Sequence, residues 1–175
     1  MADKSRDIEL PTRDQILEAA KEVLDLGHSK GKTVGTAESC TGGLVSGALT
    51  AVPGSSSVVR GGITSYAIPV KHAVLGVSQD ILDAPGVGAV SPECAAQMAQ
   101  GARRVLASDV AVSITGIAGP GGAEPGKPVG TVWFGMSNGS TIATEMHLFT
   151  GDRREVRMKA VMVALGLLKE GLEEL

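Results

Sequence analysis

The stretch that decides the fold is TVGTAESCTGGLVSGAL, residues 33–49. Its first five residues, 33–37, are short or β-branched and predict a strand. Small residues from Gly42 to Leu49 predict a helix that ends before Pro53-Gly54, a pair that interrupts helices. A strand that passes through a tight turn into a helix is a building unit of layered α/β domains.

Further elements are predicted on both sides of this unit. A capping box of Thr12 and Gln15 starts a helix that we expect to run to Gly27, and Ser91-Pro92 starts another that reaches about Leu106. The remaining predicted elements are strands at 58–66 and 110–114, a helical turn at 71–75, a hairpin of 132–136 with 141–149 around Asn138-Gly139, and a last helix at 153–172. This order implies a layered α/β sheet with at least one antiparallel pair.

Residues 115–130 contain six glycines and three prolines, a density that predicts a long loop between strands. A loop of this length in a small domain is usually functional or disordered. Its Gly-rich start lacks the GK[ST] ending of a P-loop and does not fit GxGxxG, so the motif itself assigns no nucleotide phosphate site.

The composition favours one enzyme-sized domain over residues 1–175, with residues 1–11 expected to be loosely ordered. The net charge of -3 and the absence of a basic stripe disfavour a nucleic-acid partner. The polar first residues and the lack of a long apolar run argue against a membrane segment. Two cysteines without a CxxC pair or a Cys/His cluster argue against disulfides and a metal site, and favour the cytoplasm.

Ser39 is the first candidate nucleophile, because it follows a strand and opens a helix whose free amides and dipole favour a developing negative charge. The same position suits a simple N-cap serine. Cys40 is the competing nucleophile, since a thiol at a helix start has a lowered pKa and His72 could pair with it.

Lys71 is the candidate base, because the three histidines form no recognisable triad motif and the apolar stretch 67–77 could desolvate this lysine. An exposed helix lysine is the ordinary alternative. Tyr66 is either a strand residue or a proton relay. Arg153 and Arg154 begin the last helix, where cations oppose the dipole, which hints at a bound anion as an alternative to a solvated turn.

Several motifs, taken together and in order, resemble the CinA C-terminal domain family of nicotinamide-nucleotide amidohydrolases. They are TAESCTGG at 36–43, GITSY at 62–66 with Lys71, GAVS at 88–91, TGIAGPGG at 115–122, KPVGT at 127–131, and GDR at 151–153 with Val156-Arg157. The similarity covers about residues 13–172. The chain departs from the family's pattern at 67–69, where Ala-Ile-Pro replaces a frequent Ser-Asn pair, so no role is carried over to these positions.

The resemblance implies a three-layer α/β/α domain with a five-stranded mixed sheet, similar to anticodon-binding domains. It also implies a serine/lysine amidohydrolase that needs no cofactor and no metal. Carried over position by position, the catalytic residues are Ser39, Lys71 and Tyr66. The substrate-binding residues are Thr115, Arg153, Cys40, Thr41, Gly42, Gly43 and Gly116. Larger members of the family add an N-terminal pyrophosphatase domain, an activity that we do not expect from this sequence.

The expected reaction is hydrolysis of the carboxamide of nicotinamide mononucleotide to nicotinic acid mononucleotide and ammonia. The oxyanion is expected to face backbone amides between Cys40 and Gly43, and the 5′-phosphate to lie at Arg153 and the amides of 116–122. We also expect a homo-oligomer. The alternative is a catalytically silent protein of the same fold that binds pyridine nucleotides or a protein partner.

Overall fold

Five strands form one mixed sheet in the computed structural model, which describes residues 7–175. The order is β2-β1-β3-β4-β5, with β1 parallel to β2 and β3, and with β4 antiparallel to both β3 and β5. The strands are β1 Val34–Glu38, β2 Val59–Thr64, β3 Val110–Gly116, β4 Thr131–Ser137 and β5 Ile142–Leu148. The predicted five-stranded mixed sheet and its hairpin are therefore confirmed.

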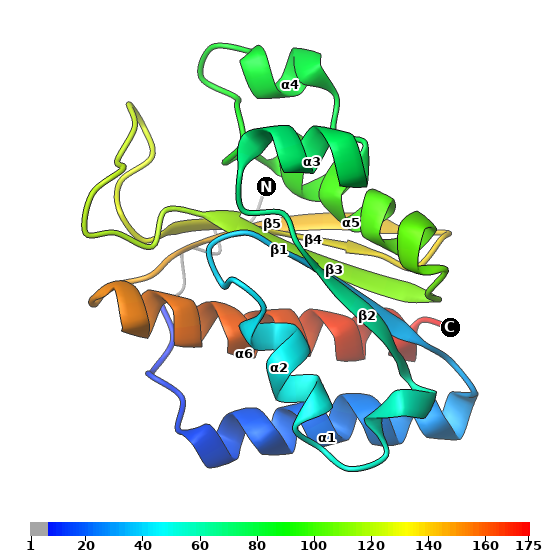
Figure 1. Ribbon diagram of the computed structural model, residues 1–175. Helices are drawn as coiled ribbons and strands as arrows, with labels where there is room; N and C mark the ends of the chain where they lie inside the picture. The colour runs from blue at the N-terminus through cyan, green and yellow to red at the C-terminus, as the bar shows by residue number, and fades with distance from the viewer. Residues whose placement is uncertain (1–6) are drawn as a thin grey trace.

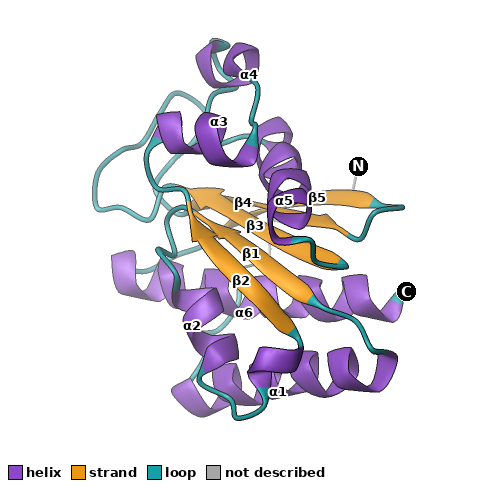
Figure 2. Ribbon diagram, turned by 45° about the vertical axis from the view of Figure 1, so that its right-hand side comes forward, coloured by secondary structure: helices purple, strands orange, loops and turns teal. Residues whose placement is uncertain are grey.

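Helices cover both faces of this sheet, as the predicted three-layer architecture requires (Figure 1). One face carries α1 Arg13–Lys30, α2 Leu44–Thr50 and α6 Arg153–Glu173. On the other face α5 Pro92–Leu106 lies against the sheet, and α3 Ile68–Leu75 and α4 Gln79–Asp83 pack next to α5 (Figure 2). The sequence analysis missed α4 and a 3-10 turn, η1 Ser55–Ser57, because each is too short to show a helical period.

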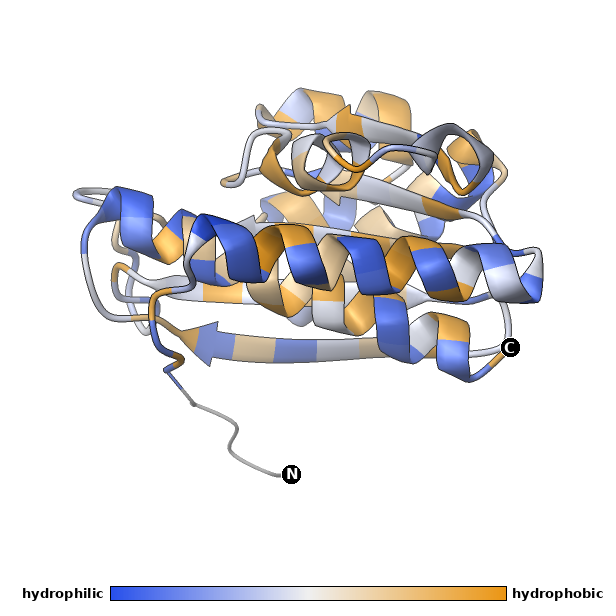
Figure 3. Cartoon of the chain, turned by 90° about the horizontal axis from the view of Figure 1, so that it is seen from below, coloured by the Kyte–Doolittle hydropathy of each residue, from blue (hydrophilic) through white to orange (hydrophobic). Residues whose placement is uncertain are grey.

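The hydrophobic core lies in two clusters, one on each side of the sheet. The larger cluster joins α1 and α6 to the sheet through residues such as Leu24, Phe134 and Leu165. The smaller joins α3 and α5 to it through Leu75, Met98 and Ala111. Figure 3 shows the face of the molecule that carries α1, whose hydrophilic residues alternate with hydrophobic ones at helical spacing.

Two predicted boundaries are wrong, each for a packing reason. The helix α1 does not end at Gly27, where a side chain would collide with Val58, but at Gly31, which adopts the left-handed φ of 62°. The loop does not begin at Thr115, because Thr115 and Gly116 still pair with β4. A Cβ on Gly116 would lie 2.7 Å from the Thr131 carbonyl oxygen, so this close strand approach requires glycine.

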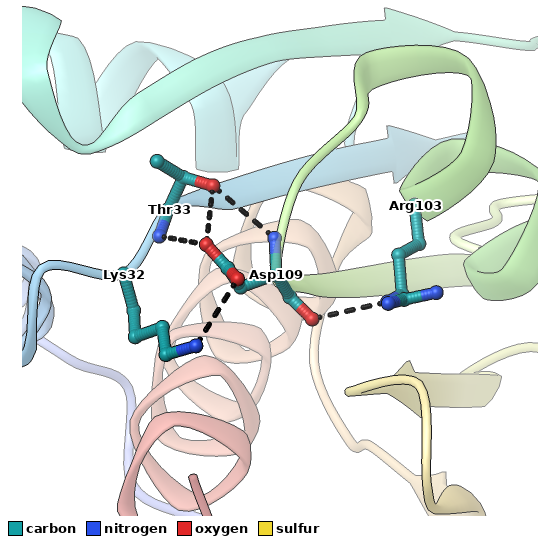
Figure 4. Close-up of polar contacts among 4 residues, drawn as sticks. All are labelled: Lys32, Thr33, Arg103 and Asp109. Atoms are coloured by element: carbon teal, nitrogen blue, oxygen red, sulfur yellow. Dashed lines mark hydrogen bonds and ion pairs between the residues drawn. The ribbon is translucent and has the colours of Figure 1, made fainter.

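At the amino end of β3, a carboxylate fixes the register of the two central strands (Figure 4). Asp109 accepts hydrogen bonds from the Thr33 amide and hydroxyl, both at 2.8 Å, and from Lys32 Nζ at 3.4 Å. The Asp109 carbonyl also accepts from Arg103 Nε of α5 at 3.1 Å. This clamp holds β1 against β3, so the opposite ends of the two strands meet in a defined position.

The chain before α1 is described only from Asp7. The Asp7 carboxylate pairs with Lys159 Nζ of α6 at 2.8 Å, and Pro11 is buried. Residues 7–11 thus have defined contacts without forming a helix or strand, while the expected loose order of residues 1–6 lies outside the described part. Between residues 7 and 175, no helix combines the length and the apolar composition needed to cross a bilayer.

The close contact of α3 with α5 depends on Gly101, and this gives a stability prediction. A Cβ on Gly101 would overlap the Leu75 carbonyl oxygen, so Gly101→Ala must push α3 away from α5. Such overpacking costs about 1–3 kcal/mol of unfolding free energy, measurable by denaturant titration. The control is Gly166→Ala at an exposed position of α6, where a Cβ meets nothing within 4 Å and should add up to about 1 kcal/mol in helix propensity. Unchanged stability in Gly101→Ala would contradict the described packing.

Candidate active site

The structure brings Ser39 and Lys71 into direct contact. Ser39 follows the last residue of β1, and Lys71 belongs to α3, the helix that follows the carboxyl end of β2. Lys71 Nζ and Ser39 Oγ are 2.8 Å apart, a normal hydrogen-bond distance. A hydroxyl and a primary amine at this distance form a nucleophile–base pair if the amine is neutral.

The surroundings of Lys71 favour that neutral form. The side chain is 1% exposed, and burial lowers the pKa of its ammonium group. Nζ lies 2.6 Å from the Ser65 carbonyl oxygen and 3.3 Å from that of Tyr66. Since both are acceptors, they take the two N–H bonds of a neutral amine and leave its lone pair for the Ser39 hydroxyl. These carbonyls therefore orient the base.

The start of α3 explains how Lys71 is placed although residues 67–69, Ala-Ile-Pro, depart from the family's pattern. Ala67 is the N-cap and makes no side-chain capping bond, so the helix begins without the usual polar cap. Pro69, within the first turn, provides a backbone already set for a helix. The Ser65 amide donates to the Glu38 carbonyl at 2.9 Å, which ties the segment before α3 to the end of β1.

The turn that carries Ser39 is held by Glu38, a residue that the sequence analysis missed. Its buried carboxylate accepts from the amides of Gly43 at 3.0 Å, Val45 at 3.1 Å and Ser46 at 2.9 Å. An acidic residue at the end of the strand, shortly before the helix α2, was the available signal for this capping role. The carboxylate holds α2 against the end of β1 and thereby fixes the turn.

The hydrogen bonds of this turn reduce the number of backbone amides that are free to bind an oxyanion. The Gly42 amide donates to the Ser39 carbonyl at 3.0 Å, and the Gly43 amide is taken by Glu38. Gly42 and Gly43 have φ values of 62° and 99°, so their contribution is to shape the turn. Of the expected group, the amides of Cys40 and Thr41 donate to no oxygen atom of the described residues.

Arg157 is a second residue that the sequence analysis did not assign to the site. From α6, its Nε donates to the Cys40 carbonyl at 3.0 Å and its Nη2 to the Thr41 carbonyl at 3.1 Å. These two bonds orient the peptide groups next to Ser39. The available signal was its spacing of four residues from Arg153, which places both side chains on one helix face.

Arg153 and Tyr66 lie together at the outer rim of the site. Arg153 Nη2 donates to the Tyr66 hydroxyl at 2.9 Å, and Nη1 donates to the Gly119 carbonyl of the long loop at 2.8 Å. Tyr66 is 58% exposed. The arginines at 153, 154 and 157 also line a hollow of about 610 Å³ together with Ala118, Pro120, Val129, Gly151 and Asp152.

Thr115 lies beside the dyad at the end of β3, but its hydroxyl donates to the Ala89 carbonyl at 2.6 Å. The Ser39 amide bonds to the neighbouring Ile114 carbonyl at 2.9 Å, so β3 supports the nucleophile through its backbone. Gly116 is paired within the sheet and contributes close strand packing. Thr115 and Gly116 thus help to hold the end of β3 in place beside Ser39.

The contacts do not support the competing thiol pair. Cys40 is buried, and this burial raises the pKa of its thiol to about 11, opposite to the lowered value that a nucleophilic thiol requires. His72 Nδ1 lies 2.8 Å from the Val77 carbonyl oxygen, at the end of its own helix. Between residues 7 and 175, no three His, Cys, Asp or Glu side chains gather closely enough to hold a metal ion.

Comparison with known proteins identifies relatives that carry the CinA name. The model of the CinA C-terminal domain family matches residues 16–172. A CinA-like protein of Thermotoga maritima is 42% identical over 151 residues, 86% of this chain, and one of Geobacter metallireducens is 42% identical over 150 residues. The chain spans 36% of the length of both relatives.

Solved structures agree with this result. The competence/damage inducible protein CihA of Agrobacterium tumefaciens has a TM-score of 0.86 and 38% identity, with 94% of this chain and 98% of that one covered. A CinA superfamily protein of Klebsiella pneumoniae has a TM-score of 0.86 and 34% sequence identity, and the match covers 91% of this chain and 99% of that one. The sequence match and the shared three-layer fold together show that this chain belongs to the CinA C-terminal domain family.

Proposed function

We propose that this chain hydrolyses the carboxamide of nicotinamide mononucleotide to nicotinic acid mononucleotide and ammonia, in the cytoplasm. The observation that carries the proposal is the buried contact of Lys71 Nζ with Ser39 Oγ at 2.8 Å, in surroundings that lower the pKa of the amine. A serine activated in this way suits acyl transfer from an amide. Family membership supports the same chemistry.

The reaction begins when neutral Lys71 takes the hydroxyl proton of Ser39 and the Oγ atom attacks the carboxamide carbon. The cationic pyridinium ring of the nucleotide makes this carbon more electrophilic. The carbonyl oxygen becomes an oxyanion, which accepts from the amides of Cys40 and Thr41. Arg157 supports the second of these, because it holds the Cys40 carbonyl, which is in the same peptide group as the Thr41 amide. The proton held by the Lys71 ammonium passes to the amide nitrogen, ammonia leaves as the carbonyl reforms, and water then hydrolyses the ester on Ser39.

The hollow lined by Arg153, Arg154 and Arg157 is our proposed site for the 5′-phosphate. The chain has a net charge of -3, so an anionic substrate requires a local group of cations rather than a general positive field. Arg153 connects this hollow to the dyad through Tyr66, whose backbone carbonyl contacts Lys71 Nζ at 3.3 Å. The phosphate and the carboxamide would thus be bound at neighbouring ends of one site.

Ammonia release tests both parts of the proposal. The purified chain should release ammonia from nicotinamide mononucleotide, and its kcat/KM for nicotinamide riboside should be at least about 100-fold lower, since several charge-assisted bonds of about 1.5–3 kcal/mol are lost. Ammonia from neither compound would favour a silent binding protein. Comparable kcat/KM values for nucleotide and riboside would show that the arginine-lined hollow does not bind phosphate.

A further inference from the structure

Arg157 belongs both to the turn that carries the nucleophile and to the arginine-lined hollow. From α6, its Nε donates to the Cys40 carbonyl at 3.0 Å and its Nη2 to the Thr41 carbonyl at 3.1 Å. The same half-buried side chain lines the hollow of about 610 Å³ that we propose for the 5′-phosphate. One guanidinium thus connects the two ends of the proposed site.

The guanidinium of Arg157 uses only one of its two edges for these bonds. Its five N–H bonds form a planar fork, and the bonds from Nε and Nη2 occupy the edge that faces the turn. The edge formed by Nη1 and Nη2 donates to no further oxygen atom of residues 7–175. Such an edge fits two oxygens of a phosphate group, which arginine commonly binds in a bidentate way.

The bond to the Cys40 carbonyl has a consequence for the amide next to it. The Cys40 carbonyl and the Thr41 amide belong to one planar peptide group, so a bond that fixes the oxygen also fixes the direction of the N–H. This N–H is one of the two that we assign to the oxyanion. Gly42 and Gly43 follow directly and have φ values of 62° and 99°, so the chain here is intrinsically flexible and depends on Arg157 for a defined position.

We infer that Arg157 is a positioning residue through which the 5′-phosphate raises the rate of amide cleavage. A phosphate bound at the free edge restrains the guanidinium, and the guanidinium holds the Thr41 amide in the direction of the oxyanion. Binding energy from a part of the substrate that does not react then lowers the barrier at the carboxamide, so the phosphate affects kcat as well as KM. The inference rests on the proposed amidase function and on the hollow as the phosphate site.

The other two arginines of the hollow have no such connection to the turn. Arg153 donates to a carbonyl of the long loop and to the Tyr66 hydroxyl. The side chain of Arg154 is exposed and makes no hydrogen bond or ion pair with residues 7–175. Arg154 is therefore the matched control for Arg157, because it has the same charge on the same helix and lines the same hollow.

The first test measures kcat for nicotinamide mononucleotide and for nicotinamide riboside, which lacks the phosphate. In the unmodified chain, we expect kcat to be at least about 10-fold higher for the nucleotide. Arg157→Lys keeps the charge of the hollow but loses the fork that holds two carbonyls, so its kcat for the nucleotide should fall to within about threefold of that for the riboside. Arg154→Lys should keep the kcat difference of the unmodified chain, with an increase confined to KM.

The second test supplies the missing group as inorganic phosphite, a separate molecule. With nicotinamide riboside as the substrate, saturating phosphite should raise ammonia release at least about threefold in the unmodified chain and in Arg154→Lys, and leave it unchanged in Arg157→Lys. The rates with and without phosphite come from one sample, so their ratio does not depend on the folded fraction. Arg157→Gln replaces the lysine variant if that variant does not fold.

A merely structural role of Arg157 would lower the rates for both substrates equally and leave these ratios unchanged. Equal kcat values for nucleotide and riboside in the unmodified chain, a kcat difference that persists in Arg157→Lys, equal losses in both lysine variants, or a riboside rate that phosphite does not raise would overturn this inference alone. Comparable kcat/KM values for the two compounds would overturn the phosphate site as well. No ammonia from the unmodified chain would overturn the proposed function itself.

Discussion

Replacement of Ser39 by alanine should reduce ammonia release from nicotinamide mononucleotide by at least about 10⁴-fold, because a covalent mechanism cannot proceed without its nucleophile. The loss should appear in kcat. The fold should be retained, since the contacts that hold the turn come from Glu38 and Arg157 and do not use the Ser39 hydroxyl. Steady-state kinetics and a thermal melt of the same preparation measure both expectations.

The neighbouring Cys40→Ala is the matched control, because it changes one atom at the adjacent position and should keep most of the activity. The pKa of this thiol is raised to about 11 by burial, so little thiolate exists near neutral pH. If Cys40→Ala were inactive while Ser39→Ala retained turnover, the thiol would be the nucleophile.

Replacement of Lys71 by arginine should reduce kcat by about 10³-fold or more, since a guanidinium keeps its charge and cannot accept the Ser39 proton. In the unmodified chain, the rate should rise with pH through one ionisation and then level off, because only the neutral amine acts as a base. Burial lowers the pKa of Lys71, so this ionisation should lie below the ordinary value of 10.5. A pH–rate profile of kcat/KM measures it.

His72→Gln serves as the control for the base. Its Nδ1 contacts the Val77 carbonyl just after α3, away from Ser39 Oγ, so its replacement should leave the pH–rate profile in place. Near-normal turnover in Lys71→Arg, or loss of the ionisation in His72→Gln, would remove Lys71 from the role of base.

The sequence was sufficient for the fold where local signals agree with packing. The Ser91 cap and Pro92 predicted the start of α5, and Asn138-Gly139 predicted the β4–β5 hairpin. Prediction from the sequence failed where a contact between distant residues determines the end of an element. Gly27 has the appearance of a helix stop, but its missing side chain makes room for Val58, a residue 31 positions later in the chain.

The residues of the site divide in the same way, into those that local sequence signals predict and those whose roles depend on long-range contacts. Ser39 and Lys71 were predicted from the strand–helix turn and from the resemblance, and the structure brings them together. The roles of Glu38 and Arg157 depend on partners in three dimensions. The spacing of Arg157 from Arg153 shows that the two share a helix face, but no spacing pattern shows that a buried carboxylate caps α2 or that one guanidinium holds two carbonyls.

The central claim is that this chain cleaves the carboxamide C–N bond of a pyridine nucleotide. The most direct measurement uses nicotinamide mononucleotide labelled with ¹⁵N in the carboxamide and follows both products by NMR and mass spectrometry. The account predicts [¹⁵N]ammonium and nicotinic acid mononucleotide in equal amounts, with neither formed by Ser39→Ala. Labelled nicotinamide with ribose phosphate, which means cleavage of the glycosidic bond, or recovery of unchanged substrate, would contradict it.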